Sequence, residues 1–102
     1  MKTIRTLMPD GTKWDVPAHL VADHRAKYYA KNDTDNEHDY AEVYRKELEF
    51  TLGNSDELID WACNNMDWDM VKDSSKKVSP ASVRCDYQDG WVNGPKTIEE
   101  IP

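Results

Sequence analysis

Residues 2–16 read KTIRTLMPDGTKWDV, and this stretch decides the fold that we expect. Apolar and polar side chains alternate over residues 3–7 and again over residues 13–16, which is the period of a half-buried β-strand. Residues 9–12 (PDGT) lie between the two runs, where proline fixes φ and glycine supplies a positive φ, as a tight turn requires. The stretch therefore predicts an antiparallel β-hairpin. Because both of its faces carry charge, we expect the hairpin to need a partner layer.

The first of three predicted helices has Pro17 in its first turn, a position that suits proline because its missing N–H would have no partner there. Helical periodicity continues for about 14 residues, up to the polar run at residues 32–36. The expected apolar face consists of Pro17, Leu20, Val21, His24 and Tyr28. The expected polar face consists of His19, Asp23, Lys27 and Lys31.

The second helix is predicted over about residues 36–52. Its apolar stripe consists of Tyr40, Val43, Tyr44, Leu48, Thr51 and Leu52. Gly53 is a natural stop after such a helix. Glu47 falls inside the stripe, and the sequence leaves open whether Arg25 or Lys27 pairs with it.

The third helix begins after a cap at Asn54 or Ser55, with Glu57 in capping-box register, and ends near residues 64–65. Its expected buried face consists of Leu58, Ile59, Ala62 and Met66. The sequence after the third helix favours two or three short strands that include Val78, Val83, Tyr87, Trp91 and Val92. A tail from Thr97 to Pro102 follows them.

Together these elements predict one small α+β domain over residues 1–102. It has an N-terminal β-hairpin, three central helices and short C-terminal antiparallel strands. Hydrophobic content is only 38%, but ten aromatic residues, four Trp, five Tyr and one Phe, are enough to anchor a small core.

Negative charge is concentrated in the middle of the chain. Residues 32–73 hold thirteen Asp/Glu against three Lys/Arg, within a chain whose net charge is −7. Such a field repels nucleic acid and membrane surfaces and attracts basic protein. We therefore expect no direct nucleic-acid binding and no membrane association. Two favourable i,i+4 pairs, Glu42 with Lys46 and Arg45 with Glu49, are expected within this region.

The chain starts without an apolar run of signal-peptide length, and Cys63 and Cys85 do not form a Cys-x-x-Cys pair. These features predict reduced thiols and a cytoplasmic location.

Candidate catalytic and metal-binding groups are sparse. Residues 33–39 resemble a calcium loop, but His38 stands where glycine is required and Tyr44 where a bidentate glutamate is required. His19, Asp23 and His38 support an alternative hypothesis, a small metal-dependent hydrolase, although zinc sites use three or four ligands. Because the sequence also lacks a nucleophile motif and a glycine-rich phosphate loop, we expect no enzyme activity, no metal and no cofactor.

The most distinctive segment is residues 58–70, which places Trp61 and Trp68 seven residues apart among carboxylates. One interpretation is ordinary core packing of both indoles. The other is a non-enzymatic acidic module that docks onto a basic protein, such as a nucleic-acid-binding protein. The partner-binding residues of this second hypothesis are Trp61, Trp68, Asp60, Asp67, Asp69, Glu42 and Glu49. A purely structural, soluble domain and a homodimer through exposed aromatic side chains are left open.

Four segments carry a resemblance to a known group of proteins: MPDGTKWDVP at residues 8–17, VADHRAKYYA at 21–30, DWACNNM at 60–66 and GWVNG at 90–94. In these segments the chain resembles small acidic proteins of unassigned function from tailed marine cyanobacterial phages. The resemblance implies a viral gene product that acts in the cytoplasm of its host. It implies no activity and no site residue.

Overall fold

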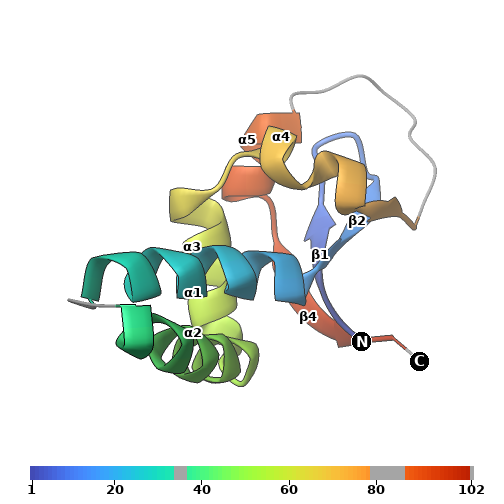
Figure 1. Ribbon diagram of the computed structural model, residues 1–102. Helices are drawn as coiled ribbons and strands as arrows, with labels where there is room; N and C mark the ends of the chain where they lie inside the picture. Colours follow the sequence, from blue (N-terminus) through green and yellow to red (C-terminus); the bar gives the residue numbers. More distant parts are fainter. Residues whose placement is uncertain (34–36, 79–86, 102) are drawn as a thin grey trace.

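The computed structural model describes residues 1–33, 37–78 and 87–101. Four antiparallel strands form one sheet in the order β3-β2-β1-β4. The strands are β1 (Lys2–Leu7), β2 (Lys13–Pro17), β3 (Lys76–Lys77) and β4 (Lys96–Glu100). The helices are α1 (Ala18–Asp33), α2 (Glu37–Leu52), α3 (Ser55–Asn65), α4 (Trp68–Val71) and α5 (Tyr87–Asn93), and a 3-10 turn, η1, covers Lys72–Ser74. The fold is therefore α+β, as predicted (Figure 1).

The N-terminal hairpin is confirmed. β1 and β2 pair so that Ile4 lies opposite Val16 and Arg5 opposite Asp15. Gly11 has a φ of 85°, the positive value that the turn required. Ile4 and Val16 are fully buried beneath the helices. On the other face of the sheet, Arg5 donates two hydrogen bonds, of 2.8 and 3.0 Å, to the carboxylate of Asp15.

The three central helices are confirmed as well. α2 ends at Leu52, immediately before Gly53. The cap of α3 is Asn54, whose side chain accepts a hydrogen bond of 3.2 Å from the backbone N–H of Glu57. In Figure 1 these three helices lie together on one side of the strands, with α4 and α5 at the end of the sheet.

Short C-terminal antiparallel strands are confirmed as β3 and β4, but the residues assigned to this part were wrong in two places. Trp91 and its neighbours form the helix α5 instead of a strand. In this helix Trp91 is fully buried, and its Nε1 donates a hydrogen bond of 3.0 Å to the carbonyl oxygen of Met66. Gly90, expected to break a strand, lets α5 pack closely on Met8. The expected tail is strand β4, in which Ile98 pairs with Ile4. Val83 lies outside the described residues.

The buried face of α1 also differs from the prediction. Pro17 ends β2, and Tyr28 is 52% exposed. The face that packs inward consists of Ala18, Val21, Ala22, Arg25, Ala26 and Ala30. Small alanines let α1 approach its neighbours closely, whereas a helical wheel gives most weight to large side chains. Consequently Leu20, His24 and Tyr28 lie along the border of the buried face.

The core joins the sheet to α1, α3, α4 and α5 and contains three of the four tryptophans: Trp61, Trp68 and Trp91. Among the described helices, none combines the length and the apolar character needed to cross a bilayer.

Candidate functional site: a groove along α1

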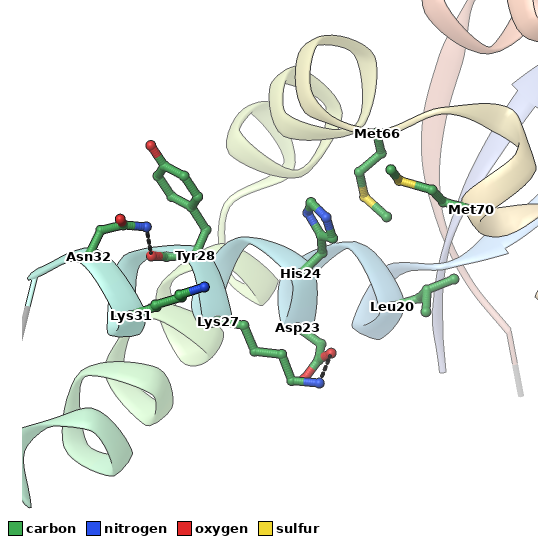
Figure 2. Close-up of a pocket in the computed structure, with 9 residues that line it drawn as sticks. All are labelled: Leu20, Asp23, His24, Lys27, Tyr28, Lys31, Asn32, Met66 and Met70. Carbon is green, nitrogen blue, oxygen red and sulfur yellow. Dashed lines mark hydrogen bonds and ion pairs between the residues drawn. The ribbon is translucent and has the colours of Figure 1, made fainter. Parts of the chain in front are cut away.

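An open groove of about 690 Å³ runs along α1 and faces the corner where α3 gives way to α4 (Figure 2). Its apolar surface comes from Leu20, His24 and Tyr28 of α1 and from Met66 and Met70 at the corner. The corner exists because α3 ends at residue 65 and α4 begins at residue 68. The two methionines therefore face α1 from two different elements.

Part of this apolar surface is open to solvent. Tyr28 and Met70 are each 52% exposed, whereas Met66 is 5% exposed and forms the floor. Methionine is flexible and polarizable, so a methionine-lined surface adapts to different apolar partners.

Trp61 supports the groove from behind. Its ring centroid lies 5.4 Å from that of Tyr28 and 5.9 Å from that of His24. Its Nε1 donates a hydrogen bond of 2.9 Å to Nδ1 of His24. Because Nδ1 is the acceptor, the neutral imidazole carries its proton on Nε2. Trp61 thus fixes both the orientation and the tautomer of a groove residue.

Asp23, Lys27, Lys31 and Asn32 form the polar rim of the groove. The Nζ of Lys27 lies 3.0 Å from Oδ2 of Asp23, and the hydroxyl of Tyr44 on α2 donates to Oδ1 of Asp23. Partial burial works to raise the pKa of Asp23, but hydrogen bonds from Tyr44 and Lys27 outweigh it and lower that pKa. The same hydrogen bond from Tyr44 to Asp23 raises the pKa of Tyr44 to about 12.

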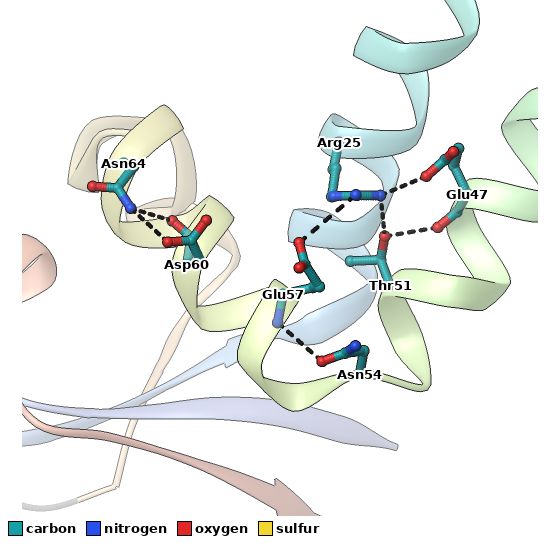
Figure 3. Close-up of polar contacts among 7 residues, drawn as sticks. All are labelled: Arg25, Glu47, Thr51, Asn54, Glu57, Asp60 and Asn64. Carbon is teal, nitrogen blue, oxygen red and sulfur yellow. Dashed lines mark hydrogen bonds and ion pairs between the residues drawn. The ribbon is translucent and has the colours of Figure 1, made fainter.

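A second polar cluster, behind α1, contains the buried cation Arg25 (Figure 3). Its guanidinium donates to Oε2 of Glu47 at 2.6 Å and to Oγ1 of Thr51 at 3.0 Å, and lies 3.7 Å from Oε2 of Glu57. It also lies over the ring of Tyr29, 4.5 Å from the centroid. Glu47 therefore pairs with Arg25 and not with Lys27. Through these contacts Arg25 joins α1 to α2 and α3.

The two tryptophans of the predicted partner site lie in the core. Trp61 is 7% exposed and Trp68 is 8% exposed, so the core-packing interpretation describes both indoles. Their seven-residue spacing does not place them on one side, because the helix ends between them. Trp68 packs edge-on against Trp14 and Tyr87, with centroids 5.4 and 5.8 Å away.

The five carboxylates of the predicted partner site are all exposed, but they are distributed over α2, α3, the corner and α4. Three lie near cations of the same chain: Glu42 is 3.1 Å from Lys46, Glu49 is 3.7 Å from Arg45, and Asp69 is 3.1 Å from Lys72. Asp60 accepts a hydrogen bond of 3.0 Å from Asn64, and Asp67 precedes α4. The structure therefore does not gather these residues into one unpaired anionic patch.

The metal hypothesis gains no geometric support. Both carboxylate oxygens of Asp23 already have partners, and the side chain of His38 lies outside the described residues, as do those of 33–37 and 39. Within the part of the chain that the structure describes, no group of three His, Cys, Asp or Glu residues is placed to hold a metal ion. Cys63 is a half-buried free thiol, and Cys85 falls in an undescribed range.

Sequence reasoning missed the groove itself. It placed Leu20, Tyr28 and Met66 on buried faces and assigned no role to Met70. The sequence does indicate the corner: residues 64–67 (NNMD) end one helix and precede the next. Met66 lies within this break and Met70 lies in the helix that follows it. Comparison with protein-family models, curated proteins and solved structures finds no match to this chain.

Proposed function

We propose that this protein is a non-enzymatic interaction module that holds an amphipathic helix of a basic partner protein in the groove along α1. The observation that carries the proposal is the half-exposed apolar surface of Tyr28 and Met70 above a buried methionine floor. Apolar surface left open in a small soluble domain costs free energy unless another molecule covers it.

The shape of the groove favours a helix as the occupant. One wall is the helix α1, and the other is the corner that carries Met66 and Met70. An amphipathic helix presents apolar anchors at i, i+3, i+4 and i+7 along one stripe, which matches a long open groove better than a closed small-molecule pocket.

Charge favours a basic partner. Three charged residues line the groove, Asp23 paired with Lys27 and Lys31 as a further cation, so the groove lining itself carries no net negative charge. The attraction to a basic partner comes from the chain as a whole, which carries −7. Long-range attraction of this kind raises the rate of association, and the buried apolar anchors supply most of the affinity. Binding should therefore be faster at low salt but should persist at moderate salt.

The chain contains four methionines, which provide a direct test by methyl NMR. Met66 and Met70 line the groove, whereas Met1 and Met8 lie elsewhere and serve as internal controls. The probes are a Lys/Leu amphipathic helical peptide, a scrambled peptide of the same composition, and a Glu/Leu amphipathic peptide. We expect the first peptide to bind most tightly and to shift only the two groove methyl signals.

Matched variants distinguish binding in the groove from nonspecific binding to exposed apolar side chains. Tyr28→Ser and Met70→Ser should each weaken binding about tenfold or more, because each removes a central apolar anchor. Val78→Ser removes an exposed apolar side chain outside the groove lining and should leave affinity unchanged. Equal binding of the scrambled peptide, or shifts at Met1 and Met8 alone, would contradict the proposal.

A further inference from the structure

We infer that a second copy of this chain docks on the open edge of β4, so that the two sheets join across a two-fold axis. In the described sheet β4 is the last strand on one side, paired only with β1. An edge strand offers unpaired backbone N–H and C=O groups to another strand. This inference is independent of the groove and of its occupant.

Hydrogen bonds at both ends of β4 show which of its backbone groups face outward. The N–H of Leu7 donates to the carbonyl of Pro95 at 3.0 Å, and the N–H of Ile101 donates to the carbonyl of Met1 at 2.8 Å. In an antiparallel ladder the bonded residues alternate, so Thr97 and Glu99 bond to β1. The backbone groups of Lys96, Ile98 and Glu100 therefore point toward the open edge.

The sequence of β4, KTIEE, is complementary to itself in one register. With Ile98 opposite Ile98 of the second copy, Lys96 lies opposite Glu100 of the second copy, and Glu100 opposite its Lys96. The three residues whose backbone groups point toward the open edge then form backbone hydrogen-bonded pairs across the contact. Both cross-strand pairs of Lys96 with Glu100 join opposite charges and are favourable. A C₂ contact of this kind uses the same surface on both molecules.

Neighbouring registers lose these pairings. Centring the contact on Thr97 would place Lys96 opposite Ile98 and Glu100 opposite Gly94, with no charge pair. Centring it on Glu99 would place Ile98 opposite Glu100 and leave Lys96 without a charge partner in β4. The charges of β4 thus discourage unrelated strands while permitting a second copy, which is why we assign this occupant.

Both charged side chains have contacts within the monomer that compete with the dimer. The Nζ of Lys96 donates a hydrogen bond of 3.0 Å to the carbonyl oxygen of Gly94. Oε1 of Glu100 accepts a hydrogen bond of 3.0 Å from the N-terminal ammonium of Met1. An ammonium has three protons, so Lys96 can keep this bond while it receives a carboxylate. Because the contact is only five residues long, we expect a weak dimer that dissociates on dilution.

Sedimentation equilibrium of the full chain over a wide concentration range tests the inference. Lys96→Glu and Glu100→Lys should each raise the dimer dissociation constant about tenfold or more, because each places like charges opposite one another twice. An equimolar mixture of the two variants should restore association as a heterodimer, and the doubly reversed chain should restore the homodimer. Lys76→Glu, on the opposite edge strand, is the control and should have no effect.

Amide hydrogen exchange supplies a readout that does not depend on a variant folding. The N–H of Ile98 should become more protected as the concentration rises, whereas that of Glu99, already bonded to β1, should not change. A chain that stays monomeric at every concentration, or a dimer unaffected by both charge reversals, would overturn the inference.

Discussion

Replacing Arg25 with methionine should be one of the most damaging single substitutions in the helical half of the molecule. Arg25 is 8% exposed and joins three helices through Glu47, Thr51 and Glu57. Methionine keeps most of the apolar stem but removes the guanidinium, leaving the carboxylate of Glu47 without its closest donor.

The expected loss follows from the exposure of the partners. Removing one member of a fully buried ion pair costs about 3–5 kcal/mol. Because the side chain of Glu47 is 29% exposed, water can replace part of the lost interaction. We therefore expect a loss of about 2–3 kcal/mol in the free energy of unfolding, a large share of the roughly 5–15 kcal/mol typical of a domain.

Urea unfolding followed by tryptophan fluorescence measures this loss. Lys46→Met is the matched control, since Lys46 and Glu42 form a pair on α2 that is 66% and 57% exposed and should contribute less than about 0.5 kcal/mol. A double-mutant cycle of Arg25→Met with Glu47→Gln should show a coupling of about 1–2 kcal/mol. A loss below about 1 kcal/mol for Arg25→Met, or no coupling, would refute the reasoning from buried charge.

Two further predictions concern single residues. The folded chain holds the proton of Tyr44 more tightly than the unfolded chain, since its pKa rises from 10.0 to about 12, so stability should fall as pH increases through that window. Tyr44→Phe should reduce this fall, as urea unfolding at pH 9 to 12 would show, and an unchanged slope would contradict the role of the Asp23 hydrogen bond. A Cβ on Gly90 would lie 2.5 Å from Sδ of Met8, so Gly90→Ala should lower stability by about 1–3 kcal/mol in thermal unfolding. Gly53→Ala, whose Cβ would meet its nearest neighbour at 3.4 Å, should lower it less, and equal losses would exclude the steric explanation.

Local patterns predicted those elements whose stability is encoded locally. The β1–β2 hairpin follows from the alternation at residues 13–16 and from a turn that needs a positive φ at Gly11. The cap at Asn54 is likewise a contact between residues three apart in sequence. In both cases the residues that decide the structure are neighbours in the chain, so periodicity and turn chemistry were sufficient.

The C-terminal part could not be predicted in this way because its structure depends on distant partners. Trp91 lies in a helix whose position is set by Met66 and by the close approach of Met8, both more than 20 residues away. β4 is a strand because β1 offers it an edge, although KTIEE has little strand propensity of its own. Tertiary context outweighed local preference in both segments.

The candidate site shows the same division between local and distant effects. Trp61 and the carboxylates near it suggested an exposed anchor, but burial of an indole is one of the largest stabilising contributions available to a domain of this size. Trp61 occupies the core, whereas Tyr28, whose ring packs against it, is half exposed, as is Met70. The proposed docking surface therefore consists of side chains at the border of the core, and Trp61 contacts two of them, His24 and Tyr28, from within the core.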